Sequence, residues 1–331
     1  MLARSARYIS AASHQRAVGH TGVRCSLCGE RAVVRVAYAS VHLCEKHFSS
    51  YFEQRFLETV RLLQMLERGE RIAVAVSGGK DSLTLLYLMA KHADRFGVEV
   101  VAVLVDEGIR GYREEKARTA ETYAREWGVE LVMKAFRKEF GFTLDEAVSA
   151  LMSNGLRYKP CTVCGVFRRY LLNRAALELG ADKLATAHNL DDEAQAFLMN
   201  AIQANLPSIA REGPRSEKVH EKLVPRVKPF YFIPEKEVLT YALLHGIESP
   251  QVECPYIVYS LRHQLRRWLN EVAERDSGVK HKVIALKHSL TPFLERGGPF
   301  RSCRACGMPS SGEICKACQL RRYIEGLLAN R

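Results

Sequence analysis

A short glycine-rich run is the part of this sequence best suited to binding a charged ligand. It reads Ser77-Gly78-Gly79-Lys80-Asp81-Ser82 and lies between an apolar segment, Ile72 to Val76, and a leucine-rich one, Leu83 to Lys91. We expect a buried strand, a tight turn and a helix. The turn would direct backbone N–H groups and the positive helix end at one point, which suits a phosphate. The simpler alternative is an ordinary strand–turn–helix connection. A Walker A loop is excluded, because Val74 occupies the position of its first glycine.

Cysteines form the second group of residues with chemical potential. Eight of the ten stand in C-x-x-C pairs. Without a secretory signal peptide, this pattern favours metal binding in the reducing cytoplasm over a disulfide framework. Two sets offer four zinc ligands each, which closes a structural site; a disulfide or chance clustering is the alternative for the first. The sets are Cys25, Cys28, Cys44 and His47, and Cys303, Cys306, Cys315 and Cys318.

Three cysteines remain: Cys161, Cys164 and Cys254. Three thiolates are one short of a closed zinc site, but they would hold a 4Fe–4S cluster by three corners and leave one iron open. Alternatively, Cys161 and Cys164 form a redox pair that carries sulfur as a persulfide. A third possibility is that all three are inert buried thiols. The first two cysteines are expected on a turn before a helix, Val166 to Gly180.

Strand-like and helical patterns alternate through the middle of the chain. Strands are expected at residues 72–76, 98–105, 130–136 and 183–187, which predicts an α/β fold with a doubly wound parallel sheet. An amphipathic helix at 48–68 joins it to the first zinc module. We predict a tail at 1–22, a zinc knuckle with its linking helix at 23–68, a catalytic domain at 69–295 and a zinc ribbon at 296–331. The tail has arginines and no acid, like a mitochondrial presequence, but a disordered tail or an upstream start codon is favoured.

Polar residues follow two of the predicted strands. Asp106 and Gly108 come after the second, and ligands of doubly wound sheets bind beyond the carboxyl ends of strands. The fourth strand leads into His188 and then Asp191 and Asp192. Two adjacent carboxylates at such an edge favour a nearby cation, and the Mg²⁺ that accompanies ATP would supply it. Alternatively, the pair caps the next helix.

The charge composition suggests a polyanionic partner. The net charge is +12, and a basic surface of that size most often serves nucleic acid. Arg262 and Arg266 would share one helix face and could bind phosphate, although a solvated basic face is the alternative. Further basic residues surround the C-terminal ribbon, among them Arg301, Arg304 and Lys316. No run of about 18 apolar residues indicates a membrane span.

Taken together, these motifs resemble a known family. The run at 77–82 resembles the PP-loop, SGGxDS, of the ATP pyrophosphatases. The chain as a whole is similar to the TtuA-type tRNA 2-thiouridine synthetases and to the archaeal and eukaryotic cytosolic wobble-uridine thiolases. This similarity runs from Cys25 to about Cys318 and includes the two zinc motifs. Its other motifs are PCTVCG at 160–165, HNLDDEAQ at 188–195 and CP at 254–255.

The resemblance implies a reaction and a set of partners. ATP at the PP-loop would adenylate O2 of a tRNA uridine, and sulfur would then displace AMP to give 2-thiouridine. Lys80 would balance phosphate charge, and Asp191 and Asp192 would hold Mg²⁺ or polarise the attack. The family implies two Zn²⁺ and a 4Fe–4S cluster on Cys161, Cys164 and Cys254. It also implies a homodimer and a sulfur donor that is a ubiquitin-like thiocarboxylate protein.

Other functions remain open at this point. The knuckle favours the T-loop uridine, with the wobble uridine as the alternative position. A persulfide route would perform the same reaction without a cluster. A PP-loop amidotransferase or small-molecule ligase would share the ATP site but would have no use for two zinc modules. A non-catalytic, zinc-containing RNA-binding protein would not explain the run at 77–82.

Overall fold

A five-stranded parallel sheet forms the centre of the molecule. The computed structural model describes residues 22–295 and 298–329, so the predicted tail lies almost entirely outside the described residues. The strand order is β5-β4-β3-β6-β7, and all neighbours are parallel. The predicted doubly wound α/β fold is therefore confirmed. The strands are β3 (Arg71–Val76), β4 (Glu99–Asp106), β5 (Glu130–Ala135), β6 (Lys183–Ala185) and β7 (Arg226–Val227).

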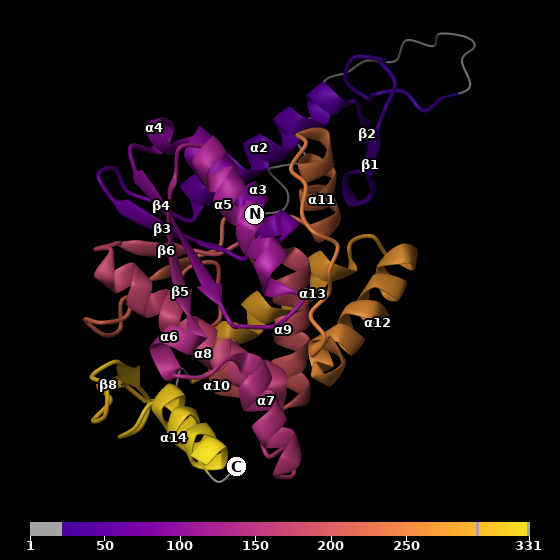
Figure 1. Ribbon diagram of the computed structural model, residues 1–331. Helices are drawn as coiled ribbons and strands as arrows, with labels where there is room; N and C mark the ends of the chain where they lie inside the picture. The colour runs from indigo at the N-terminus through magenta and orange to yellow at the C-terminus, as the bar shows by residue number, and fades with distance from the viewer. Residues whose placement is uncertain (1–21, 296–297, 330–331) are drawn as a thin grey trace.

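Helices cover both faces of this sheet (Figure 1). One face packs against α3 and α5, with α11 and α2 behind α3, and the other packs against α8. The α-helices in the described part of the chain are α2 (Glu45–Leu62), α3 (Lys80–Lys91), α4 (Ala93–Phe96), α5 (Arg113–Glu126), α6 (Phe136–Phe140), α7 (Leu144–Ser153), α8 (Pro160–Glu178), α9 (Leu190–Ile202), α10 (Leu206–Arg211), α11 (Glu235–Leu244), α12 (Leu261–Arg275), α13 (Val279–Leu290) and α14 (Lys316–Ala329). Short 3-10 turns are η2 (Ala37–Ala39), η3 (Ile257–Tyr259) and η4 (Thr291–Phe293). In residues 22–295 and 298–329, no helix is long and apolar enough to cross a membrane.

Small cysteine-bearing modules lie at opposite ends of the molecule (Figure 1). The N-terminal one is the antiparallel hairpin of β1 (Val34–Val36) and β2 (Val41–Leu43), followed by α2. The C-terminal one pairs β8 (Arg301–Ser302) with β9 (Pro309–Ser310) before α14. The C-terminal module shares a hydrophobic cluster with α7 and α8, so it packs beside the segment that carries Cys161 and Cys164.

Aromatic packing joins α2 to the central domain. Phe48, Phe52 and Phe56 lie one helical turn apart, and each is fully buried. Phe52 stacks on Tyr241 of α11 with ring centroids 4.4 Å apart, and Phe56 meets Phe230 at 6.0 Å. Each buried phenylalanine contributes about 1.5 to 3 kcal/mol relative to an exposed one. Helix α2 is therefore part of the main core rather than a free linker.

One boundary differs from the prediction in a way that affects the site. Helix α8 begins at Pro160 instead of Val166. Proline suits the first helical position, because its φ is already helical and its missing N–H has no partner there anyway. Cys161 and Cys164 therefore lie within the first turns of α8, and the expectation of a separate turn before the helix was wrong.

Candidate active site

The predicted phosphate-binding turn forms between β3 and α3. Gly78 has φ +75°, and a Cβ added to it would lie 2.0 Å from the carbonyl oxygen of Lys116. Glycine is therefore required both for the backbone conformation and for the close approach of α5. The backbone N–H of Ser77 donates to Ser82 Oγ at 3.0 Å, and Gly79 is the N-cap of α3. The turn thus presents the N-terminus of a twelve-residue helix, as predicted.

Carboxylates surround the lysine of this turn. Lys80 Nζ lies 3.0 Å from Asp81 Oδ2 and 2.7 Å from Glu235 Oε1. Arg266 binds the same Glu235 carboxylate at 2.9 Å, so it reaches the phosphate turn from α12. Asp81 Oδ1 is buried with no hydrogen-bond partner among the described residues, and burial raises the pKa of this carboxyl to about 6. An unpaired buried carboxylate oxygen beside a phosphate cradle fits a cation such as Mg²⁺.

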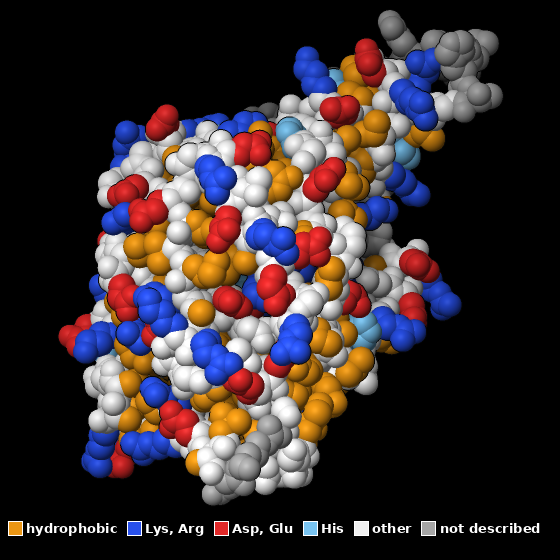
Figure 2. Space-filling model, viewed as in Figure 1, with side chains coloured by type: hydrophobic (Ala, Val, Ile, Leu, Met, Phe, Trp, Pro, Cys, Tyr) orange, Lys and Arg blue, Asp and Glu red, His pale blue; other side chains and the backbone are white. Residues whose placement is uncertain are grey.

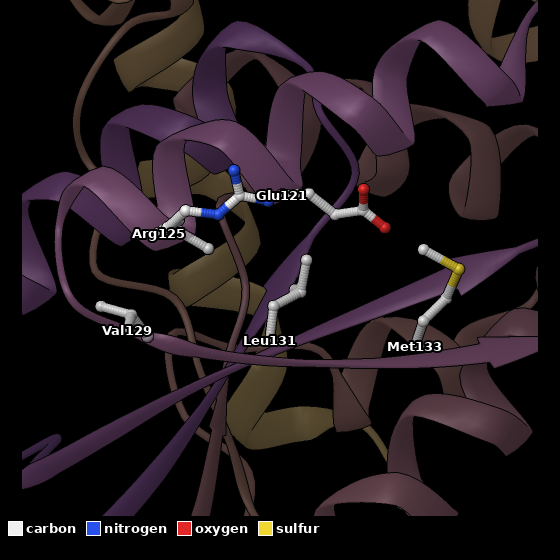
Figure 3. Close-up of a pocket in the computed structure, with 6 residues that line it drawn as sticks. Glu121, Arg125, Val129, Leu131 and Met133 are labelled. Atoms are coloured by element: carbon white, nitrogen blue, oxygen red, sulfur yellow. The ribbon is translucent and has the colours of Figure 1, made fainter.

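A cavity of about 240 Å³ opens at the carboxyl ends of β3, β4 and β6. Side chains from the turn, from α8 and from α12 line it, including Ser77, Asp81, Ser82, Glu107, Arg113, Arg168, His188, Asp192 and Arg262. This is the edge at which doubly wound sheets bind ligands. A second hollow, of about 320 Å³, lies between α5 and β5. Figure 3 shows Glu121, Arg125, Leu131 and Met133 around it, a mostly apolar lining without the convergent polar groups of the first cavity.

The two adjacent aspartates have different surroundings. Asp192 lines the cavity, forms a capping box with Asn189 and lies 3.5 Å from Arg262. Asp191 is 3% exposed, accepts the backbone N–H of Glu235 at 2.9 Å and pairs with Lys280. Asp192 therefore fits both interpretations, since it takes part in the cap of α9 and also lines the cavity. Asp191 holds the start of α11, and with it Glu235, in place.

Two more residues were predicted at the strand ends, His188 and Asp106. His188 is uncharged at neutral pH, and Asp106 accepts a hydrogen bond from the backbone. His188 lines the cavity with Nδ1 2.9 Å from Thr186 Oγ1. Burial, followed by the charge of Lys228, lowers the pKa of His188 to about 3, so it is neutral at pH 7. Asp106 Oδ1 accepts the N–H of Gly108 at 2.8 Å and thus shapes the turn after β4.

A charge cluster that we did not predict lines the cavity next to Cys164, with Glu107 and Arg113 buried and Arg168 partly exposed. Glu107, 1% exposed, has Oε2 2.5 Å from Arg113 Nη2 and Oε1 3.7 Å from Arg168 Nη1. Arg113 Nη1 also donates to the carbonyl of Ser77 at 2.9 Å, so it contacts the phosphate turn directly. The position of Glu107 in the sequence could have indicated this cluster. Glu107 directly follows Asp106 at the end of the second predicted strand, and successive side chains of an extended segment point in opposite directions.

The three remaining cysteines lie near one another and near Arg168. Cys161 and Cys164 lie on α8, and Cys254 lies in the loop before η3. The Cys161 thiol donates to the carbonyl of Tyr256 at 3.4 Å, which brings the two segments together. Burial raises the pKa of Cys164 to about 12, while the positive charge of Arg168 acts in the opposite direction. A bound metal or cluster would therefore displace a proton.

This trio differs from the two other cysteine sets. In each of those, all four ligand atoms lie within 4.8 Å of one another, whereas the trio does not form such a group among the described residues. A cluster of several irons holds its cysteines further apart than one ion does, so the wider arrangement fits the predicted 4Fe–4S group better than a single zinc. Arg168 and Arg113 nearby suit the negative charge of thiolate ligands.

In both terminal sets the four ligand atoms lie close enough together to bind one metal ion, and their spacing can be compared with that of a tetrahedral zinc site. A Zn–S bond of about 2.3 Å implies sulfur atoms about 3.8 Å apart. The separations are 3.8 Å for Cys28 and Cys44 and 3.7 Å for Cys306 and Cys315. His47 Nδ1 lies 3.2 Å from Cys44 Sγ and 3.5 Å from Cys25 Sγ. The predicted ligands are thus brought together at both ends of the chain.

Comparison with known proteins decides the family. A model described as the PP-loop domain matches residues 48–273, and one described as the N-terminal LIM domain of 2-thiouridine synthetase TtuA matches residues 24–49. A solved structure, U34-tRNA thiolase NcsA from Methanococcus maripaludis with its [4Fe-4S] cluster, superposes with a TM-score of 0.78. It is 30% identical, and the match covers 92% of this chain and 97% of that one. The chain belongs to the PP-loop family of TtuA and NcsA.

Other members of the TtuA and NcsA family match over similar lengths. A probable sulfurtransferase of Methanocaldococcus jannaschii is 36% identical over 295 residues, which are 88% of this chain and 85% of the relative. The tRNA-5-methyluridine(54) 2-sulfurtransferase of Thermus thermophilus is 34% identical over 301 residues, 89% of this chain and 90% of the relative. The resemblance drawn from the motifs is therefore confirmed along nearly the whole chain.

The basic residues predicted to contact tRNA lie in two places. Arg262 pairs with Asp192 of the cavity, and Arg266 pairs with Glu235 beside Lys80. Arg301 is exposed, Arg304 pairs with Glu313 at 3.2 Å, and Lys316 lies over the ring of Tyr158 at 4.7 Å. On the face seen in Figure 2, basic and acidic side chains are interspersed, so net charge alone does not locate the RNA surface.

Proposed function

We propose that this protein is a tRNA-uridine 2-sulfurtransferase that converts ATP to AMP and diphosphate. The observation that carries this proposal is the wall shared by its two sites. Arg113 donates to the carbonyl of Ser77 in the phosphate turn, Glu107 pairs with Arg113 and Arg168, and Arg168 approaches Cys164. A uracil base held between the cavity and the cysteine trio would be within reach of both an activated phosphate and a sulfur source.

Adenylation is assigned to the cavity. The N-terminus of α3 and Lys80 would bind the phosphates, which would replace the carboxylates that Lys80 now contacts. Asp81 and Asp192 would hold Mg²⁺, which supplies charge neutralisation when bound. Uridine O2 would bond to the α-phosphorus as the bond to diphosphate breaks. Adenylation makes this oxygen part of a good leaving group, so C2 becomes open to attack.

Sulfur transfer is assigned to the cysteine side. A 4Fe–4S cluster held by Cys161, Cys164 and Cys254 would provide an open iron for sulfide when bound. The C2–S bond would form as the C2–O bond to AMP breaks. Arg168 would stabilise negative charge next to Cys164 during this exchange. Persulfide transfer through Cys161 and Cys164 is the alternative that the experiment below separates.

The remaining assignments concern partners and modules. We propose one Zn²⁺ in each four-ligand set, a ubiquitin-like thiocarboxylate protein as the sulfur donor, and a homodimer. We also retain the domain boundaries 23–68, 69–295 and 296–331, although α2 shares its core with the central domain. Each terminal module is too small for a core of its own, so the metal would supply much of its folding energy.

The T-loop uridine is the preferred acceptor position. The TtuA N-terminal model matches residues 24–49, and relatives from Pyrococcus, Thermotoga and Thermus are named for position 54. The wobble uridine is the second candidate, because the matching solved structure is a U34-tRNA thiolase. Mass spectrometry of tRNA from a deletion strain would show which uridine loses its 2-thio group.

The test uses anaerobically purified protein. We expect diphosphate release that depends on tRNA, and 2-thiouridine formation when sulfide or a thiocarboxylate donor is added. Replacing Cys161, Cys164 or Cys254 by alanine should remove iron and thiolation together while zinc remains. Full thiolation by iron-free protein would contradict the cluster route, and a persulfide on Cys161 or Cys164 would further require a donor of sulfane sulfur, because sulfide cannot form a persulfide without an oxidant. Diphosphate release that ignores tRNA would contradict the proposed function itself.

A further inference from the structure

Several arginines converge beside the nucleotide cavity, on the side of the cysteine trio. Arg168 and Arg262 line the cavity itself. Arg169 follows on α8, and its guanidinium lies across Gly165, where an added Cβ would come 3.2 Å from Arg169 Nη1. Because Gly165 is next to Cys164 in the helix, Arg169 is held at the same end of α8 as the sulfur ligands.

A fourth arginine approaches from the sheet. Arg226 lies on β7, where it is in register with Leu184 of β6. Residues paired in this way project from the same face of a sheet. Leu184 belongs to a hydrophobic cluster with Ala176 of α8, so this face is the one that α8 covers. Arg226 therefore projects toward the helix that carries Arg169.

Charge compensation is incomplete in this group. Among the residues that the structure describes, Arg168 and Arg262 have carboxylate partners, whereas Arg169 and Arg226 have none within ion-pair distance. Arg169 is exposed and Arg226 is half-buried, so an anion can reach both, and a bound anion would relieve the repulsion between these neighbouring cations. Half-buried Arg55, by contrast, has Glu237 at 2.9 Å.

Resting on the proposed function, we propose that Arg169 and Arg226, with Arg262 at the cavity, bind backbone phosphates of the acceptor RNA next to the modified uridine. Guanidinium groups bind phosphate oxygens in pairs, which fixes position as well as charge. The phosphates of ATP have a separate cradle at the N-terminus of α3. The uridine must lie between that cradle and the cysteines, so its own flanking phosphates come to the side where these arginines lie.

A connection to the C-terminal module extends this subsite. The loop before β7 reaches the ribbon, where His220 Nε2 lies 3.1 Å from Ser302 Oγ. Arg301, adjacent to Ser302, is exposed. The arginine subsite and the basic ribbon are therefore joined by one stretch of chain, and an RNA strand leaving the cavity past Arg226 would meet Arg301.

The experiment replaces both unpaired arginines in the full-length protein. Binding of unmodified tRNA to Arg169→Ala/Arg226→Ala is measured across a salt series, and ATP binding is measured without RNA. Each lost phosphate contact lowers the salt slope by about 0.7 to 0.9, so we expect a decrease of about 1.4 to 1.8. At 0.1 M salt this corresponds to roughly 25- to 60-fold weaker tRNA binding. ATP affinity should stay within twofold.

Two further variants serve as controls. Arg169→Lys/Arg226→Lys retains both charges and should keep most of the salt slope. Arg95→Ala, an exposed arginine on α4 at the far end of α3, should leave both affinities unchanged. Loss of ATP affinity with normal tRNA binding would assign the arginines to the nucleotide and overturn the proposal. An unchanged salt slope would also overturn it, since the arginines would then be solvated surface. If the unaltered protein failed to bind tRNA, the proposed function would fail instead.

Discussion

Replacing Glu107 by alanine tests the charge cluster between the two sites. Glu107 and Arg113 are 1% and 3% exposed, and their charged atoms lie 2.5 Å apart. The change would leave Arg113 buried with its charge uncompensated. Arg168, whose side chain is 46% exposed at 3.7 Å, is screened by solvent and contributes little to the loss. The expected loss of stability therefore comes from the buried Glu107–Arg113 pair.

Breaking a buried ion pair from one side costs about 3 to 5 kcal/mol, because the remaining charge has no partner. With a urea slope of about 3 kcal/mol per molar, the unfolding midpoint should fall by about 1 to 2 M. Glu107→Gln keeps the size and the acceptor oxygen, so a smaller loss of about 1 to 3 kcal/mol is expected. The double variant Glu107→Gln/Arg113→Met removes both charges and should lose less than the two single variants summed.

Urea unfolding of the zinc-loaded protein, followed by circular dichroism, gives the midpoints. The same variants are assayed for AMP formation, which should fall in Arg113→Met because the carbonyl of Ser77 loses its hydrogen-bond donor. A midpoint for Glu107→Ala within about 0.3 M of the unaltered protein would refute the reasoning, since about 1 kcal/mol is within the range of an exposed pair. If the loss of stability in the double variant equalled the sum of the losses in the two single variants, the charges of Glu107 and Arg113 would not interact, which would also refute the reasoning.

Three more predictions follow from single residues. Gly78→Ala should abolish AMP formation but retain tRNA binding, because its Cβ would lie 2.0 Å from a backbone oxygen; measurable AMP formation would contradict this. Cys303→Ser should halve bound zinc and also reduce iron loading, because the ribbon shares a hydrophobic cluster with α8; normal iron content would argue against this coupling. Burial lowers the pKa of His281 to about 4, so the unfolded protein takes up the proton first and stability falls by up to about 3 kcal/mol as the pH drops from 6.5 to 4. In His281→Leu that fall should be smaller, and an identical pH profile would exclude the histidine as its source.

The sequence was informative wherever the chemistry was local. Lys80 and its neighbours could be placed because a strand, a glycine turn and a helix follow one another directly. The zinc ligands could be placed because Cys25 and Cys28 need only a hairpin to meet Cys44. In such cases the residues are joined by a single turn or hairpin, so their separation along the chain determines their separation in the fold.

Contacts between distant elements could not be predicted in this way. Glu107 meets Arg168 across 61 residues, and only the packing of α8 against β4 brings them together. Asp191 and Asp192 looked equivalent in the sequence, yet adjacent positions on a helix point about 100° apart. The partners that separate them, Lys280 and Arg262, come from α13 and α12. Nothing near residue 191 in the sequence indicates either helix.

The position of Arg168 explains why one helix serves both halves of the proposed reaction. It lies four residues after Cys164, so both side chains project from the same face of α8. The first turn of that face carries the sulfur ligand, and the next turn forms the cavity wall. Any shift of α8 would therefore move the cysteine and the cavity together, and their separation would be preserved. The apolar packing of α8 against β4 fixes the helix relative to the sheet, and Arg113 joins Glu107, at the end of β4, to the carbonyl of Ser77. Packing and hydrogen bonds thus connect the phosphate turn to the helix that carries Cys164, which suits a reaction in which the activated carbon and the incoming sulfur must meet at bonding distance.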